Sequence, residues 1–183
     1  MPMIDAYIPE NTLTVAGEAN LIEKVTDLMV GHELRRIVDL IDDPEQAAVS
    51  HQRAAQLAWL FLHRTEVYVG GKPPAAPVYK FHISIPEGQV DAEFFNSIVP
   101  DITTAVAEAE NGTWPHIASR VWVFVHEVPD GSWGAGRSRR LGEIVDFVAP
   151  GLGGFAENRL ADERRAAAKA TVSLAEANTS PTP

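Results

Sequence analysis

A six-residue pattern occurs twice in this chain and limits what the chain can fold into. Residues 59–64 read Trp-Leu-Phe-Leu-His-Arg, and residues 122–127 read Trp-Val-Phe-Val-His-Glu. Both segments combine aromatic and branched aliphatic residues, which predicts two buried strands. Upstream, residues 7–10 (Tyr-Ile-Pro-Glu) are echoed by residues 84–87 (Ser-Ile-Pro-Glu), each time where a strand would give way to a helix. A chain that repeats itself in this way predicts two copies of one supersecondary unit.

Each half also carries a helical pattern between these segments. Apolar residues spaced three and four apart fall on one face of a helix. They are Leu21, Val25, Leu28 and Met29 in the first half, and Phe94, Ile98, Ile102, Ala105 and Ala109 in the second. Pro100 lies inside the second pattern. We therefore expect it to kink that helix or to mark its boundary.

Each half thus reads as strand, helix, strand and glycine loop, which is the order of a βαβ unit. One unit is too small to cover both faces of its sheet. We therefore predict an α+β fold in which two fused βαβ units form one mixed sheet with helices on one face. The first unit would span residues 2–72, with a helical insertion at 32–56; residues 73–77 would be a linker, and residues 78–150 the second unit. Residues 151–183 would form a C-terminal helix and a disordered tail.

Composition excludes several classes of protein. The chain has 15 basic and 25 acidic side chains and a net charge of −10. Binding to nucleic acid or to anionic lipid needs clustered positive charge, so we expect neither partner. There are no cysteines, which excludes disulfides, thiolate nucleophiles and cysteine zinc sites. We see no signal segment and no apolar run long enough for a membrane span, and we expect a cytoplasmic protein.

Two further features give the repeat a more specific meaning. Pro2 directly follows the initiator methionine, and residues 129–136 (Pro-Asp-Gly-Ser-Trp-Gly-Ala-Gly) follow the last core strand. Together with the βαβ repeat, these features resemble the tautomerase superfamily. A single unit looks like 4-oxalocrotonate tautomerase, and the fused double unit is similar to the cis-3-chloroacrylic acid dehalogenase and malonate semialdehyde decarboxylase branches. The resemblance covers residues 2–150 and implies a homotrimer.

The resemblance also implies a mechanism. The initiator methionine would be removed, and the exposed nitrogen of Pro2 would act as the catalytic base or acid. A secondary amine in an apolar, positively charged site has a lowered pKa, and near neutral pH it moves protons next to a carbonyl efficiently. We expect no cofactor and no metal. The second half begins inside the chain, where nitrogen is an amide, so we expect one site per chain.

The implied substrate is a small carboxylate or carbonyl compound, such as a 2-oxo or enol acid. The candidate pocket residues are Gln89, Phe124, His126, Trp133 and Arg137. The arginines that tautomerases place at the substrate carboxylate are missing from their usual positions, since Gln89 follows Glu87-Gly88 and Trp122 opens the later strand. Replacement cations would have to come from Arg120, Arg137, Arg139, Arg53 or His51.

Three other interpretations stay open. A protonated Pro2 would favour a hydratase or decarboxylase, whereas the missing arginines favour a non-catalytic family member that binds a ligand or partner. A ferredoxin-like α+β barrel has the same order of elements, but its strands would pair antiparallel and Pro2 would be irrelevant. His63 and His126 occupy matching positions of the repeat. Neither is followed by a second ligand at metal-site spacing, so we predict no metal site.

Overall fold

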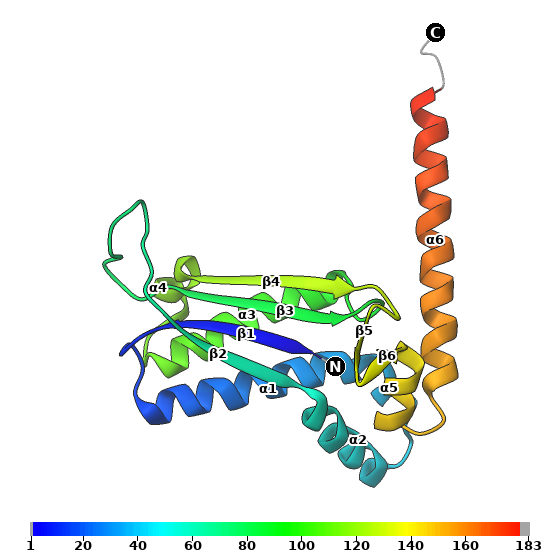
Figure 1. The fold of residues 1–183 in the computed structure, drawn as a ribbon, viewed down its shortest axis with the longest axis horizontal. Helices are drawn as coiled ribbons and strands as arrows, with labels where there is room; N and C mark the ends of the chain where they lie inside the picture. The colour runs from blue at the N-terminus through cyan, green and yellow to red at the C-terminus, as the bar shows by residue number, and fades with distance from the viewer. Residues whose placement is uncertain (1, 180–183) are drawn as a thin grey trace.

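A computed structural model describes residues 2–179 of the chain, except for the side chains of residue 92 and residues 172–179. The central sheet has the strand order β2-β1-β3-β4 (Figure 1). These strands are β1 (Met3–Pro9), β2 (Trp59–Thr65), β3 (Tyr79–Pro86) and β4 (Val121–Val128). β1 is parallel to β2 and β3 is parallel to β4, while β1 and β3 are antiparallel. This is the predicted mixed sheet of two βαβ units. The two parallel pairs distinguish it from the ferredoxin-like alternative.

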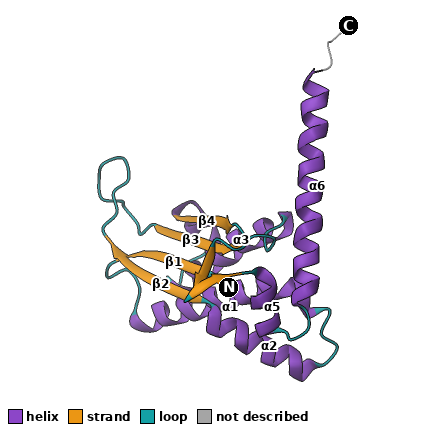
Figure 2. Cartoon of the chain, turned by 45° about the vertical axis from the view of Figure 1, so that its right-hand side comes forward, coloured by secondary structure: helices purple, strands orange, loops and turns teal. Residues whose placement is uncertain are grey.

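Two long crossover helices cover one face of the sheet (Figures 1 and 2). They are α1 (Val15–Val38) and α3 (Ala92–Ala109). Alternate strand residues point into this layer, where Ile4, Phe81 and Phe94 are fully buried. Burial of each large apolar side chain stabilises the fold by roughly 2 kcal/mol. The main core therefore lies between the sheet and these two helices.

The helices of the first half begin at caps that the sequence encodes. The Thr14 hydroxyl accepts a hydrogen bond from the backbone nitrogen of Gly17 at 3.0 Å and caps α1. This helix runs unbroken to Val38, so residue 32, the expected start of the insertion, is not an element boundary. As predicted, Asp43 caps the next helix, α2 (Pro44–Leu57), and Pro44 is its first residue.

Pro100 lies inside α3 without ending it. The hydroxyl groups of Thr103 and Thr104 donate to the carbonyl oxygens of Val99 and Pro100, at 2.7 and 2.9 Å. Ile98 and Ile102, on either side of the proline, are fully buried against the sheet. Tertiary packing thus holds the helix together, and Pro100 does not mark a boundary.

A second, smaller core forms beside the sheet from elements of both halves. A short helix α4 (Trp114–Ile117) and a 3-10 turn (Ala118–Arg120) lead into β4. A hairpin of β5 (Trp133–Ala135) and β6 (Arg137–Arg139) follows, and then α5 (Leu141–Val148) and α6 (Gly153–Thr179). The second core joins the C-terminal half of α1 to α2, α5 and the start of α6.

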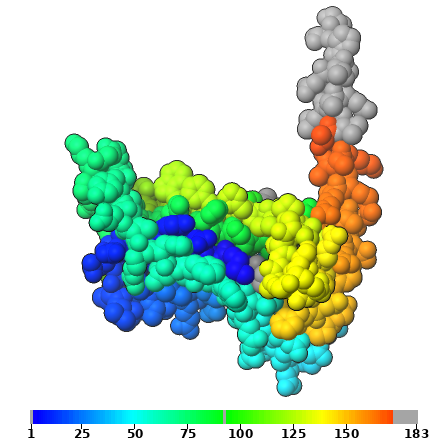
Figure 3. Space-filling model, in the orientation of Figure 1, coloured from blue at the N-terminus to red at the C-terminus, as the bar shows by residue number. Residues whose placement is uncertain are grey.

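Two segments extend away from the sheet and its helices: the β2–β3 connection and the C-terminal helix. The β2–β3 connection, which contains residues 73–77, projects from the body (Figures 1 and 3). The predicted C-terminal helix is confirmed as α6. Of the tail expected to be disordered, Thr179 ends this helix, and the later residues lie outside the described part. Within residues 2–179, no helix is both long and apolar enough to cross a bilayer.

The prediction that residues 59–64 and 122–127 are buried strands is wrong for one face of each. Trp59 and Phe61 are 58% and 46% exposed, and Trp122 and Phe124 are 64% and 43% exposed. Both strands lie at the edges of the sheet, and these side chains point to the face without helices. Aliphatic residues alternate with them and pack on the core. β2 and β4 therefore carry apolar side chains on both faces, but only one face of each strand packs on the core.

Candidate functional site

Pro2 is buried at the start of β1. Its carbonyl oxygen accepts a hydrogen bond from the backbone nitrogen of Trp59 at 3.2 Å, which extends the β1–β2 ladder beyond Met3. Because Met3 also pairs with Ser84, the start of the chain lies beside the end of β3. Both neighbouring strands therefore hold Pro2 at one end of the sheet. Met1 lies outside the described residues, so its removal stays an expectation.

The β5–β6 hairpin lies beside the start of the chain (Figures 1 and 2). Its strands pair Trp133 with Arg139 and Gly134 with Ser138. A Cβ atom at Gly134 would lie 2.0 Å from the carbonyl oxygen of Arg137. That separation is a severe clash with backbone, so only glycine allows the hairpin to close at this position.

Carboxylates anchor the base of the hairpin to the rest of the site. Asp130 accepts hydrogen bonds from the Leu141 backbone nitrogen at 2.7 Å and from the Arg140 guanidinium at 3.0 Å. Glu87, just after β3, accepts from the backbone nitrogen of Asp130 at 3.0 Å. The start of α5, the hairpin and the end of β3 are therefore tied together.

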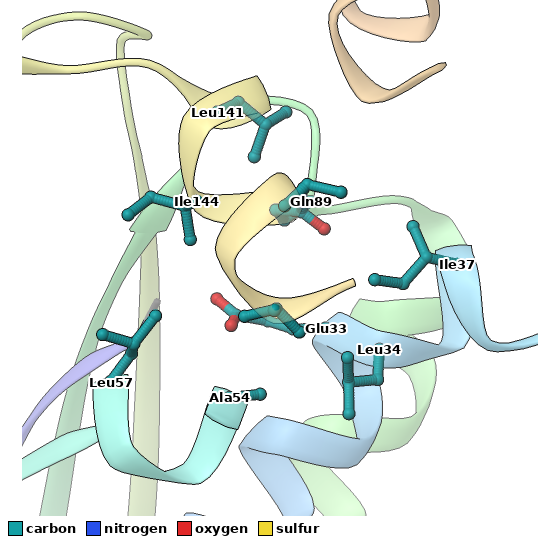
Figure 4. Close-up of a pocket in the computed structure, with 10 residues that line it drawn as sticks. Glu33, Leu34, Ile37, Ala54, Leu57, Gln89, Leu141 and Ile144 are labelled. Atoms are coloured by element: carbon teal, nitrogen blue, oxygen red, sulfur yellow. The ribbon is translucent and has the colours of Figure 1, made fainter. Parts of the chain in front are cut away.

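A small cavity of about 40 Å³ lies at this end of the molecule (Figure 4). Aliphatic side chains form most of its wall: Leu34, Ile37, Ala54, Leu57, Leu141, Ile144, Val145 and Val148. Its two polar lining residues are Glu33, from α1, and Gln89, from the loop after β3. Gln89 is only 6% exposed. Leu57, which belongs to the cavity wall, lies two residues before Trp59, whose backbone nitrogen donates to the Pro2 carbonyl oxygen.

Trp133 and Arg137, both predicted pocket residues, lie on the hairpin. The indole nitrogen of Trp133 is buried and has no hydrogen-bond acceptor among the described residues. Arg137 is exposed, and its guanidinium forms an ion pair with Glu143, with Nη1 and Oε2 at 3.2 Å. This pair lowers the pKa of Glu143 to about 2. The positive charge of Arg137 is thus already compensated within the chain.

Phe124 and His126, the other two predicted pocket residues, lie on the helix-free face of β4 and do not line the cavity. Phe124 stacks on Trp122, with ring centroids 6.0 Å apart. His126 contacts His82 edge to face at 4.4 Å. Of the five predicted pocket residues, Gln89, Trp133 and Arg137 lie at the end of the sheet where Pro2 lies. His126 also lies at this end, because it pairs with Ser84, which pairs with Met3, whereas Phe124 lies two residues further along the open face.

The other arginines proposed as replacement cations are also accounted for. Arg120 precedes β4 and so lies at the opposite end of the sheet, where it binds Glu110 with two hydrogen bonds of 2.9 and 2.7 Å. Arg53 donates to the carbonyl oxygen of Phe147 at 3.5 Å. Arg139 faces Trp133 across the hairpin. Arg139 therefore lies on the hairpin, beside the start of the chain, and forms no ion pair within the described part of the chain.

Sequence reasoning missed Glu33, the one carboxylate in the cavity wall. It lies on the same helix as the core residues Val25 and Met29 but faces the second core, which forms only when α2 and α5 pack on α1. The helical pattern placed Leu34 and Ile37 on an apolar stripe beside it. The position of a carboxylate next to this apolar stripe was the sequence feature that could have identified Glu33.

A polar network crosses the helix-free face. His63 bonds to the Asp5 carboxylate at 2.6 Å and stacks on Tyr7 at 4.5 Å, and the Lys80 ammonium lies 3.9 Å from the centre of the Tyr7 ring. These contacts give His63 a hydrogen-bond partner and a stacking partner on this face. In the described part of the chain, no group of three or more His, Asp or Glu side chains is placed to hold a metal ion.

Comparisons with known proteins agree on the architecture. The chain matches no protein-family model, and no curated protein matches its sequence. Among solved structures it is similar to Pt0534 inactivated by 2-oxo-3-pentynoate, with 16% identity, 75% of this chain and 94% of that chain covered, and a TM-score of 0.55. A fused 4-OT solved as a symmetric trimer has 15% identity, coverages of 81% and 98%, and a TM-score of 0.54.

A third similar structure is N1, a member of the cis-3-chloroacrylic acid dehalogenase family. It has 14% identity, covers 75% of this chain and 82% of its own, and has a TM-score of 0.52. At this level of identity the likeness concerns the fold. The chain therefore shares the fold of fused 4-OT and of this dehalogenase family member, as the βαβ repeat predicted.

Proposed function

We propose that this chain is a tautomerase or isomerase that acts on a small 2-oxo or enol acid, with the amine of Pro2 as general base and acid. The observation that carries the proposal is the position of Pro2, which is buried at the end of the sheet where the hairpin and α5 meet. Removal of Met1 would create a secondary amine there. The fold shared with Pt0534 and fused 4-OT supports the same interpretation.

The proposed reaction moves one proton and needs no cofactor or metal. In the enol-to-ketone direction, the Pro2 nitrogen takes the hydroxyl proton, and the oxygen electrons form the carbonyl bond. The electrons of the carbon–carbon double bond then take a proton back from the Pro2 ammonium at the α-carbon. The side-chain amide of Gln89 and the indole N–H of Trp133 are donors that could hold the substrate oxygens.

A second candidate is a lyase, a hydratase or decarboxylase in which Pro2 stays protonated. This candidate needs a carboxylate close to the Pro2 nitrogen, and Glu33 is the acidic side chain in the wall of the cavity at this end of the molecule. A carboxylate near an amine stabilises the ammonium form and raises the amine pKa, whereas an apolar surrounding lowers it. Measurement of the Pro2 pKa by ¹⁵N NMR separates the two: a pKa near neutral supports the tautomerase, and a pKa well above neutral supports the lyase.

A third candidate is a family member without catalytic activity that binds a ligand or partner. The ion pair between Arg137 and Glu143 favours it, because the arginine is then less available for a substrate carboxylate. Retention of Met1, seen as the intact mass of the purified protein, would support this candidate and contradict both enzymatic ones.

We also propose that the chain assembles as a homotrimer. The exposed aromatic side chains at both edges of the sheet, Trp59 and Phe61 on β2 and Trp122 and Phe124 on β4, support contacts between copies. Exposed apolar surface and unpaired strand edges of this kind mark interaction sites. A trimer that closes in a ring would cover the edges of all three sheets.

The test of the enzymatic proposal compares the wild type with Pro2→Ala on the enol forms of small 2-oxo acids, followed by ultraviolet absorbance. We expect Pro2→Ala to lose at least a hundredfold in kcat/KM. The matched control is Pro9→Ala, which changes a proline of the same strand whose nitrogen is an amide. Equal rates for wild type and Pro2→Ala would remove the mechanism.

A covalent probe tests the same nitrogen independently. 2-Oxo-3-pentynoate carries an alkyne next to a ketone, and a neutral amine can add to it with transfer of the amine proton to the alkyne carbon. We expect the wild type to gain the mass of one inhibitor molecule on its N-terminal peptide. An adduct that maps to any other peptide would argue against an activated Pro2.

A further inference from the structure

α6 is longer than its contacts with the body require. Its 27 residues span about 40 Å at 1.5 Å per residue. Near its start, Ala156 and Leu160 are buried in the second core. From residue 164 to residue 171, every side chain is exposed, and Figures 1 and 3 show this part of the helix standing clear of the sheet. A helical segment of this length is only marginally stable in water without packing.

The sequence of α6 continues its buried face outward. Residues spaced alternately by four and three are Ala156, Leu160, Glu163, Ala167, Ala170, Leu174 and Ala177. This spacing is typical of a helix that packs along its whole length on another element. Glu163, the one charged member, pairs with Arg36 at 3.0 Å where the helix leaves the body. Beyond that point the stripe consists of alanine and leucine.

The outer part of α6 and the β4 edge face a common space. β4 is an edge strand of the sheet, and in both ribbon views α6 extends past it (Figures 1 and 2). Trp122 and Phe124, on this strand, are the exposed aromatic residues described above. A partner that covers the β4 edge would therefore also lie against the outer part of α6.

Two observations identify this partner as a second copy of the chain. The opposite edge strand, β2, exposes the same pair of residue types at the same repeat positions, Trp59 and Phe61. Contacts from the β4 edge of one copy to the β2 edge of the next can close into a ring. Charge agrees with this, because residues 164–179 carry three basic side chains and one acidic side chain, Glu176, while the chain has a net charge of −10.

We propose that α6 is a strap between subunits, in which residues 164–179 of one copy pack on the next copy beside its β2 edge. The proposal rests on the assembly of copies proposed above and assigns a role to a helix that the catalytic proposal does not use. The similar structures cover 75% to 81% of this chain, so part of it has no counterpart in them.

The absence of cysteine allows a direct test. A single Ala167→Cys variant is labelled with a maleimide-linked benzophenone, mixed with ¹⁵N-labelled unmodified protein, allowed to exchange subunits and irradiated. We expect cross-links between light and heavy chains that map near β2. The control is Val15→Cys, at a fully exposed position on the opposite end of α1, which we expect not to cross-link chains. Cross-links found only within one chain would overturn the proposal.

A second measurement follows assembly by sedimentation velocity. We expect Ala167→Glu/Ala170→Glu, which charges the stripe without shortening the helix, to raise the dissociation constant at least tenfold. The matched control, Ala166→Glu/Ala168→Glu, adds the same charge on the flanks of the stripe and should change it far less. Equal effects of the two double variants on the dissociation constant would overturn the proposed role of α6 but not the proposed assembly. A wild-type chain that is monomeric at all concentrations would overturn the strap and the proposed assembly, whereas Pro2 activity is judged separately by Pro2→Ala.

Discussion

The guanidinium of Arg164, on α6, donates two hydrogen bonds to the carboxylate of Glu87, at 2.8 and 2.6 Å. These bonds lower the pKa of Glu87 to about 2, against the opposing effect of partial burial. Glu87 also holds Asp130, so the pair links the base of α6 to the loop that carries the hairpin. One ion pair thus connects the proposed strap with the proposed site.

This pair predicts a pH-dependent stability. Because the folded pKa of Glu87 lies below that of an unfolded carboxyl group, the pair stabilises fully above about pH 4.5 and is lost as the pH falls towards 2. We expect Arg164→Met to lower the urea midpoint at neutral pH, and to lower it less in acid. Urea denaturation of the wild type and of Arg164→Met, at neutral pH and in acid, checks this prediction. Arg165→Met, which breaks an exposed pair with Asp162, is the control. A loss that is the same in acid would contradict the assignment.

Arg159 also lies on α6, but its replacement is expected to stabilise the protein, in contrast to the replacement of Arg164. All three nitrogen atoms of its guanidinium are buried without a hydrogen-bond partner in the described part of the chain. Burial, with the nearby charge of Arg36, lowers its pKa. The charges of Glu163 and Asp91 offset only part of this burial effect, so we expect Arg159→Met to raise the melting temperature by roughly 3 °C. Thermal unfolding measures this, again with Arg165→Met as the control. A fall in melting temperature would mean that Arg159 has a partner in solution.

The topology could be predicted because it depends on local patterns. The repeat of residues 59–64 and 122–127 and the helical stripes between them are each contained in short windows of sequence. The exposure of Trp59 and Trp122 could not be predicted in the same way. Their strands carry apolar residues on both faces, a pattern that normally indicates burial on both sides, and only the order of strands shows that one face stays open in the single chain.

The candidate site was predictable in part for the same reason. Trp133 and Gln89 follow strands whose ends must meet at one edge of the sheet, so their convergence with Pro2 follows from topology. Glu33 could not be found in this way, because its cavity needs α2 and α5 to pack on α1. The pairing of Arg137 with Glu143 depends on how the hairpin turns into α5. Such contacts between elements leave no periodic signal.

The exposed aromatic pair on β4 predicts an effect on assembly without a large effect on folding. Trp122 and Phe124 stack on each other on the open face and are not part of the core. We expect Trp122→Glu to raise the dissociation constant between copies at least tenfold, while the stability of the monomer changes by less than about 0.5 kcal/mol. Sedimentation velocity and urea denaturation give the two numbers. Phe147→Glu, at an equally exposed phenylalanine on α5, is the control, and equal dissociation constants for wild type and Trp122→Glu would refute the interface.

Substitutions at two glycines of the hairpin can distinguish an effect on the β5–β6 pairing from an effect on the stability of the whole protein. At Gly134 a Cβ atom would clash with the carbonyl oxygen of Arg137, whereas at Gly136 nothing lies within 4 Å of a Cβ atom and only the φ of +69° constrains the residue. We therefore expect Gly134→Ala to open the β5–β6 pairing. Asparagine tolerates a positive φ, so Gly136→Asn should keep the hairpin closed.

If the hairpin forms one wall of the Pro2 site, Gly134→Ala should lower kcat/KM at least tenfold with little change in melting temperature, because the hairpin lies outside both cores. Gly136→Asn should keep near wild-type activity. Amide exchange of residues 133–139 shows whether the pairing has opened in each variant. An open hairpin with full activity would remove Trp133 and Arg137 from the site while leaving Pro2 in it, since Pro2 is held by the β1–β2 ladder and not by the hairpin.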